Sequence, residues 1–423
     1  AVISARTNYL MAIADLLKYK KGEITVPVYL CDAINPPQAR VANEMTLFEE
    51  KKPYEVKTTV GNFLFSHSII TKRRIQQLAI IMEDCVKTEK STKDFLNKVE
   101  KELILTKDEF KESELYLIET YEKLVELECK GLNGIWARII KNAFAPLFVG
   151  QYDFIVGNPP WVTWGSLPKE YCEATAPIWK KYALFEHKGL KARLGSSGDD
   201  ISVLVTYVAI DKYLLPKRYL CFVITQSLFK SAGGGDGFRK FCIDGKENHI
   251  KVIQVDDMVE LQPFEGATNR TAVFLCQKGE KTTYPVEYHL WKKNEKGSLP
   301  IDLKFDEVIK KTTVKYLKAQ SIDGRFNGPW ISAKPKALEA SKKLLGKSHY
   351  KARKGISTSA NGVYWVNIVS QKNNILTVEN LYDIGDKTVE SVRREVDSDL
   401  VYPLIRGRDV SRWYCKPSTS IVI

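Results

Sequence analysis

Five short apolar runs, rich in β-branched and aromatic residues, constrain the fold of this chain more than any other feature. They extend from Ile24 to Cys31, Tyr152 to Val156, Tyr219 to Thr225, Lys251 to Asp256 and Thr271 to Cys276. Runs of this length and composition are typical of strands buried in a sheet. Helical patterns lie between most of them, so the sequence predicts an α/β fold with a mainly parallel sheet.

Between the first and second runs, residues from about 48 to 147 are highly charged and helical in pattern. A connection of this length is far beyond an ordinary loop, so we expect a helical insertion. Two interpretations of the insertion remain open. It is either an amphipathic helical hairpin packed on the core or a surface that contacts DNA or a partner.

The alternation of strands and helices fades after Gly279, which favours a boundary between a first domain, 1–280, and a second domain, 281–423. The second part has 26 Lys and Arg against 15 Asp and Glu, a net charge of +11 out of the chain's +13. A nearly neutral front joined to a basic rear is expected of a catalytic core joined to a module that binds a polyanion. A basic surface that serves only solubility is the alternative.

The remaining composition excludes several classes of protein. The eight cysteines are scattered and form no C-x-x-C pair, so we expect neither a zinc site nor a disulfide framework, and a reduced, cytoplasmic setting. No apolar run approaches the roughly 18 residues of a membrane span, so we expect no membrane association. The opening residues, AVISARTNYLMAIADLL, have a helical pattern without the features of a signal peptide, and we interpret the chain as a fragment.

The sharpest local feature is Tyr-Asp-Phe-Ile-Val-Gly-Asn-Pro-Pro-Trp, residues 152–161. Its apolar strand delivers Asn158, Pro159, Pro160 and Trp161 to the carboxyl end, where open α/β sheets place their ligands. Two successive prolines fix φ and stiffen the turn. A stiff aromatic turn without function is the alternative, but the sequence favours an active site.

These residue types suit methylation of an amino group. An adenine amino nitrogen is a poor nucleophile because its lone pair is delocalised into the ring. The side-chain oxygen of Asn158 and the backbone carbonyl of Pro159 can accept its two N–H bonds and favour a more tetrahedral nitrogen. Trp161 offers a flat face for a base that has been swung out of the duplex. The methyl group is then transferred by direct displacement, without a covalent enzyme intermediate.

The Asp-Phe-Ile-Val-Gly-Asn-Pro-Pro-Trp stretch resembles the catalytic motif of the gamma-class N6-adenine DNA methyltransferases, which include single-chain type IIG restriction-modification enzymes. The resemblance implies a Rossmann-like class I methyltransferase sheet, S-adenosylmethionine as methyl donor, and double-stranded DNA as substrate. Three residues would then contact this cofactor: Asn158, Asp32 and Ala33. Asp32 ends the stretch Val28-Tyr-Leu-Cys-Asp. Phe264, in Leu261-Gln-Pro-Phe, would pack against the second face of the extruded base, although core packing is nearly as good an interpretation.

The same resemblance extends into the basic rear, where Tyr402-Pro-Leu-Ile-Arg-Gly-Arg-Asp-Val-Ser-Arg-Trp is similar to the opening of a target-recognition domain. Arg406, Arg408 and Arg412 would then contact phosphates or bases. A solvated basic loop is the alternative for each. The resemblance makes residues 1–280 a methyltransferase domain and 281–423 an α+β target-recognition domain, which we expect to be incomplete.

One part of the family pattern is missing. The glycine-rich turn that should hold the methionine part of the cofactor does not occur in the expected place before the first run, so we expect the sheet to be incomplete at its amino terminus. Two rival functions stay open, namely methylation of protein glutamine or of RNA amino groups, and a DNA-binding module without catalysis. An endonuclease fused elsewhere in the parent protein is a further possibility that does not exclude the methyltransferase.

Overall fold

The computed structural model describes residues 2–22, 26–39, 53–58, 60–132, 135–185, 200–231, 235–245, 247–264, 270–295, 297, 299–300, 302–346, 349–350, 355–356, 358, 360–384 and 389–423. The chain divides into two compact units, Ala1–Leu345 and Gly346–Ile423. The first unit has a mixed α/β architecture and two separate hydrophobic cores. No helix in these ranges combines the length and the apolar content that crossing a membrane requires.

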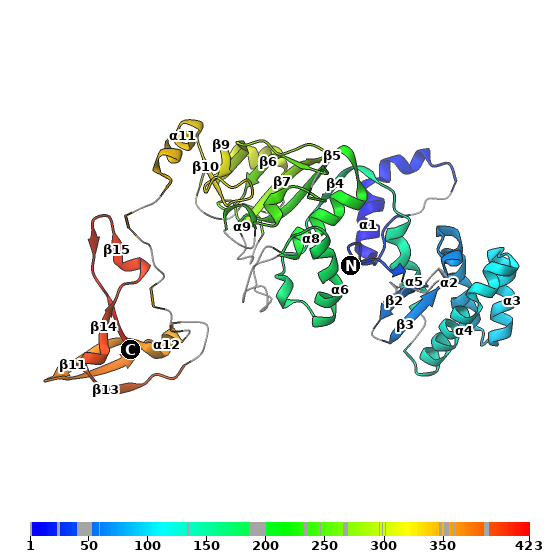
Figure 1. Cartoon of the computed structure of the whole chain (residues 1–423), viewed down its shortest axis with the longest axis horizontal. Coiled ribbons are helices and arrows are strands. Elements are labelled where there is room, and N and C mark those ends of the chain that lie inside the picture. The colour runs from blue at the N-terminus through cyan, green and yellow to red at the C-terminus, as the bar shows by residue number, and fades with distance from the viewer. Residues whose placement is uncertain are drawn as a thin grey trace. The chain divides into compact units, whose positions relative to one another are not determined.

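A seven-stranded mixed sheet dominates the first unit, in the order β10-β9-β8-β6-β7-β5-β4 (Figure 1). Among the described residues, β4 is parallel to β5 and β6 is parallel to β8, whereas the other pairings are antiparallel. The strands are β4 (Tyr152–Gly157), β5 (Leu214–Thr225), β6 (Ile250–Asp257), β7 (Thr271–Lys278), β8 (Val286–Lys293), β9 (Thr312–Ser321) and β10 (Trp330–Ala333).

Four of the five apolar runs therefore lie in strands, but the prediction of a mainly parallel sheet is wrong. A strand buried on both faces is apolar whichever way it runs, so its composition does not indicate its direction. The first run is also different. Its described part, Val26 to Cys31, belongs to no sheet. A strand needs a neighbour for its backbone groups, and no described strand pairs along the outer edge of β4.

The sheet also continues beyond residue 280. β8, β9 and β10 extend it as an antiparallel meander, and the two compact units divide after Leu345. The predicted boundary after residue 280 differs from this division because the fading of helices marks a change of topology within one sheet. Of the net charge of +11 in residues 281–423, +7 lies in 281–345 and +4 in 346–423.

Helices bury the apolar faces of this sheet. α8 (Ile201–Val208) is apolar on all sides and almost wholly buried, and its N-cap Asp200 accepts a hydrogen bond from the Ser202 backbone N–H at 2.9 Å. Aromatic side chains fill the core, among them Trp179, Tyr207 and Phe274. The other described helices of this part are α1 (Val2–Ala12), α6 (Lys169–Lys181), α9 (Ser227–Lys230), α10 (Phe305–Lys311) and α11 (Pro335–Leu344).

The predicted insertion has a core of its own, built from helices together with a β-hairpin that the charge pattern did not indicate. We call residues 54–148 the helical module. α2, α3 and α4 begin at the side-chain caps Thr71, Ser91 and Thr106, and Thr106 and Glu109 form a reciprocal capping box. Its elements are β2 (Tyr54–Thr58), β3 (Gly61–Phe65), α2 (Lys72–Lys87), α3 (Thr92–Leu103), α4 (Lys107–Cys129) and α5 (Trp136–Phe144); the short β1 (Gln38–Ala39) pairs with β2.

The second unit is a five-stranded sheet in the order β13-β12-β11-β17-β14, with a two-stranded hairpin, β15–β16. Its buried core is small, with Val366, Leu376 and Val378 at the centre. The elements are α12 (Asn361–Tyr364), β11 (Trp365–Lys372), β12 (Ile375–Asn380), β13 (Arg393–Asp397), β14 (Val401–Leu404), β15 (Val410–Ser411), β16 (Tyr414–Cys415) and β17 (Thr419–Val422).

Candidate functional site

One edge of the seven-stranded sheet gathers the polar residues that follow three strands. β4 and β5 are parallel, and β7 runs antiparallel to both β5 and β6. β4, β5 and β6 therefore end at the same edge. Asn158, Gln226 and Asp257 lie at these ends, in the position where open α/β sheets bind ligands.

Asn158 lies directly after β4, with an exposed side chain that has no hydrogen-bond partner among the described residues. Pro159 is buried and Pro160 is exposed. The preceding Gly157 lies against the Phe222 ring, because a Cβ at this position would come within 3.2 Å of that ring. The start of the turn is thus packed against β5, while the Asn158 side-chain amide remains accessible to a ligand.

Trp161 is tied to the sheet. Its indole N–H donates a hydrogen bond to the Val223 carbonyl of β5 at 3.1 Å. Its ring contacts Phe264 edge-to-face, with centroids 5.3 Å apart and an angle of 79° between the rings. A base held between two parallel rings needs roughly 7 Å, twice the spacing of stacked bases. The structure therefore brings the two predicted stacking residues together in a contact that leaves no room for a base between them.

A buried polar network at the same edge of the sheet was not predicted. The Asp257 carboxylate accepts hydrogen bonds from the Gln226 amide at 3.1 Å and from the Tyr288 hydroxyl at 2.5 Å. It also accepts the Val259 backbone N–H at 3.1 Å, at the start of the segment that leads to Phe264. Burial raises the pKa of Tyr288, and Asp257 adds to the rise, so the phenol stays a proton donor. The paired Asp256-Asp257 at a strand end was the available signal in the sequence.

Asp32 and Ala33 lie on a separate turn. Asp32 is half-buried, and one carboxylate oxygen accepts the backbone N–H groups of Ile34 and Asn35 at 2.9 and 3.1 Å. The exposed Ala33 accepts the Tyr213 hydroxyl through its carbonyl at 2.8 Å. Asp32 thus stabilises its own turn, and within the described residues no hydrogen bond or ion pair joins this turn to Asn158.

The three predicted DNA-binding arginines belong to the second unit. The Arg406 guanidinium lies over the Trp365 ring, 5.5 Å from its centroid, with two nitrogens buried and without hydrogen-bond partners. Arg408 and Arg412 are exposed. Arg406 therefore packs within the fold, and the other two face solvent.

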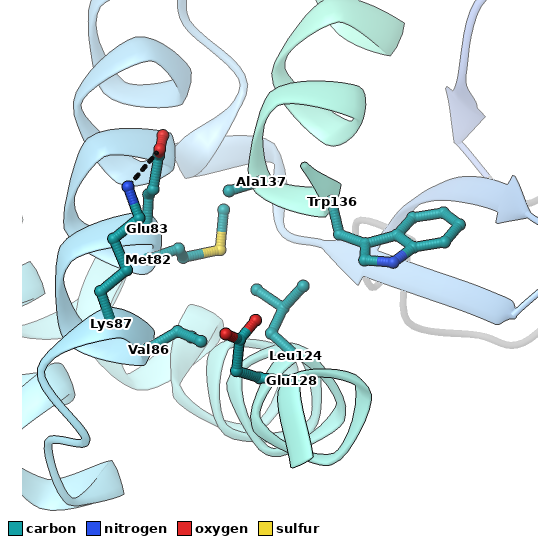
Figure 2. Close-up of a pocket in the computed structure, with 8 residues that line it drawn as sticks. All are labelled: Met82, Glu83, Val86, Lys87, Leu124, Glu128, Trp136 and Ala137. Carbon is teal, nitrogen blue, oxygen red and sulfur yellow. Dashed lines mark hydrogen bonds and ion pairs between the residues drawn. The ribbon is translucent and has the colours of Figure 1, made fainter. Parts of the chain in front are cut away.

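The helical module contains a small pocket between α2, α4 and α5, with Trp136 at one side (Figure 2). Its volume of about 50 Å³ is far below the roughly 300 Å³ or more of cofactor sites. Met82, Val86 and Leu124 line it with the acidic side chains Glu83 and Glu128. It is a gap between helices rather than a cofactor site. No group of three or more potential metal ligands occurs in the described ranges.

The family model of the Eco57I restriction-modification methylases matches residues 39–259, which is more than half of the chain and includes the Asn158 turn. The chain belongs to this family. A comparison with curated protein sequences found no match.

Solved structures resemble this family member only over part of its length. The M protein of the type I restriction enzyme EcoKI is 14% identical, with a TM-score of 0.27 over 39% of this chain and 30% of that one. A DrdV–DNA complex is 18% identical, with a TM-score of 0.28 over 44% and 19%. A nuclease-deletion mutant of the type ISP enzyme LlaGI with a DNA substrate mimic is 18% identical, with a TM-score of 0.28 over 60% and 22%. The chain thus covers less than a third of each of these chains.

Proposed function

We propose that this methylase-family chain carries the catalytic turn of a site-specific DNA methyltransferase that transfers a methyl group from S-adenosylmethionine to the N6 amino group of adenine, within a restriction-modification system. The observation that carries the proposal is the free Asn158 side chain at the end of β4, next to the anchored Trp161. Both belong to the part of the chain that matches the methylase family.

The chemistry follows from what these groups can accept. The side-chain oxygen of Asn158 and the Pro159 carbonyl accept the two N–H groups of the adenine amino nitrogen. The nitrogen lone pair is thereby directed toward the methyl carbon, and after the N–C bond forms one amino proton passes to solvent. When bound, S-adenosylmethionine supplies the electrophilic methyl group and retains the electron pair of its broken S–C bond. Preorganised acceptors lower the barrier because they need no reorientation during the reaction.

The base would stack on Trp161. Its hydrogen bond to Val223 fixes this ring, so Phe264 is the ring that must move to admit a base. Phe264 is 39% exposed, and no hydrogen bond ties its side chain to the sheet as Val223 ties Trp161. The edge-to-face pair then corresponds to the closed state without substrate.

The cofactor would be held in part by the turn at Asp32. Its carboxylate is fixed by two backbone N–H groups, and the Tyr171 side chain lies near it. A fixed, half-buried carboxylate beside the exposed Ala33 suits the amino group and the ring edge of an adenine. The described residues supply no comparable group for the methionine part.

Double-stranded DNA is the proposed partner. Arg408 and Arg412 are exposed cations of the second unit, and residues 281–345 add a net charge of +7 to the first unit. Lys and Arg side chains that neutralise phosphates supply sequence-independent affinity for DNA. Methylation of RNA or of protein glutamine uses the same acceptors, and substrate comparison distinguishes these alternatives.

The test uses the full-length gene product that contains this sequence. It is incubated with mixed-sequence duplex DNA, RNA or protein and with methyl-labelled S-adenosylmethionine, and the products are hydrolysed and separated. We expect label in N6-methyladenine of DNA. Asn158→Ala should lower transfer by about 100-fold or more, as loss of one preorganised donor or acceptor does in other enzymes. Asn97→Ala, at an exposed position on α3, is the matched control and should not change the rate.

The outcomes separate the alternatives. Label in RNA or protein, with none in DNA, would replace the proposed substrate. DNA binding without any transfer would favour a binding module that has no catalysis. Equal transfer by the wild type and Asn158→Ala would remove the Asn158 turn from the chemistry.

A further inference from the structure

The β15–β16 hairpin carries the most exposed large apolar side chain of the described residues. Trp413 is 92% exposed. Val410 pairs with Cys415 and Ser411 with Tyr414, so Arg412 and Trp413 alone form the turn. In the second unit, the hairpin extends away from the five-stranded sheet (Figure 1).

Trp413 also has an unfavourable backbone conformation. Its φ of 68° lies in the left-handed region. Gly and Asn adopt this conformation with little strain, whereas a bulky side chain there destabilises the fold. The ring packs against no core residue that could compensate for this cost, since it is almost fully exposed. Strain and exposure together at one side chain indicate selection for binding rather than for folding.

The surface around Trp413 is cationic. Arg408, Arg412 and Lys416 are exposed, and their side chains make no hydrogen bond or ion pair within the described ranges. Asp409, the one acidic residue from 406 to 416, instead accepts the Arg406 backbone N–H at 2.8 Å and the Ser418 hydroxyl. The Asp409 carboxylate thus forms its hydrogen bonds within the loop and pairs with none of these three side chains. The three cations remain available to an anionic partner.

The Arg412 guanidinium lies 5.8 Å from the centroid of the Trp413 ring. This cation–π contact holds the arginine beside the ring. An aromatic side chain flanked by unpaired cations suits a partner that has both flat apolar faces and a phosphate backbone. A two-stranded ribbon is also narrow enough to enter a groove of duplex DNA.

We propose that the β15–β16 hairpin enters a groove of duplex DNA and inserts Trp413 between neighbouring base pairs, while Arg408, Arg412 and Lys416 contact phosphates. The insertion unstacks one base step and bends the duplex, as apolar side chains do in other DNA-binding proteins. This inference rests on the proposed function, since it takes duplex DNA as the partner of the chain.

The test measures the affinity of the full chain for a mixed-sequence duplex of about 30 base pairs, and for the matching single strand, over a range of salt concentrations. Trp413→Ala and Trp413→Gly should bind the duplex about 5- to 150-fold more weakly, as loss of one stacking contact predicts. Their salt dependence should not change. Arg412→Gln should reduce the salt slope by about 1, because one phosphate contact is lost. Phe305→Ala is the matched control, since Phe305 is 71% exposed outside the hairpin.

Trp413→Gly separates binding from folding. Glycine adopts the left-handed conformation without strain, so the melting temperature of the variant should equal or exceed that of the wild type. Its affinity for duplex DNA should nevertheless fall. A fall in melting temperature would make Trp413 a structural residue and overturn the proposal. So would duplex affinity equal to that of the wild type, or a loss confined to single strands. A wild-type chain that binds no DNA would instead contradict the proposed function itself.

Discussion

The contact between Trp161 and Phe264 assigns different tasks to two aromatic side chains. Trp161 is anchored to Val223, whereas Phe264 only covers it. Trp161→Phe should keep a stacking face but lose the anchor, so we expect a moderate fall in kcat/KM for DNA methylation, about 10-fold. Trp161→Ala should lose both the stacking face and the anchor, so kcat/KM should fall by about 100-fold or more. Steady-state kinetics on duplex DNA would measure both changes.

Phe264→Ala provides the contrasting variant. If Phe264 must move aside for a base, its removal lowers the cost of opening and should weaken DNA methylation less than Trp161→Ala does. A larger loss at Phe264 than at Trp161 would contradict this division of roles. The sequence indicated both residues, through a motif and a resemblance. It could not indicate the Val223 bond or the Asp257 network, because both join residues that are far apart in the chain.

At the scale of elements, α4 of the helical module starts at a charged cap that should depend on pH. Arg74 donates two hydrogen bonds to Glu109, which lowers the pKa of this carboxyl from 4.5 to about 2. A lowered pKa in the folded state stabilises the fold above the unfolded pKa, and this contribution is lost as the pH falls toward 2. Glu109→Gln should therefore lower the melting temperature at pH 7, and the difference should shrink between about pH 4.5 and pH 2.

Glutamine can still cap the helix, so this substitution tests the charge alone. Glu112→Gln, at an exposed position on the same helix, should show no such pH-dependent difference. Equal behaviour of both variants in thermal melts from pH 2 to pH 7 would exclude the Arg74 pair as a source of stability. The helices of this module could be predicted because their caps and apolar spacing are local. The hairpin β2–β3 could not, since its apolar face is defined only by the helices that cover it.

For the whole molecule, the two units differ greatly in the size of their cores. The second unit buries only a few apolar side chains around Leu376, whereas the seven-stranded sheet of the first unit covers a large aromatic core. We expect two thermal transitions, with the second unit unfolding first. Leu376→Ala should destabilise only that transition, by about 2–5 kcal/mol, and Leu220→Ala, on β5, only the other. Calorimetry of the wild type and both variants would detect this, and a shift of both transitions by either variant would contradict it.

The division into these units was not predictable from the periodicity of the sequence. β8, β9 and β10 add to the sheet without helices between them, so the loss of rhythm after Gly279 gave the impression of a new domain. The pairing of β8 with β6, across about 30 residues, and the burial of Tyr288, Ala319 and Trp330 in the same core show that the core continues.

The strand that ends at Asn158 is paired on one side only. In the described part of the chain β4 pairs with β5 alone, and the Phe154 and Val156 side chains are 68% and 78% exposed. Such an edge should exchange its amide hydrogens rapidly and offer a template for any additional strand. A polypeptide that docks there would slow this exchange along the strand that leads into the Asn158 turn.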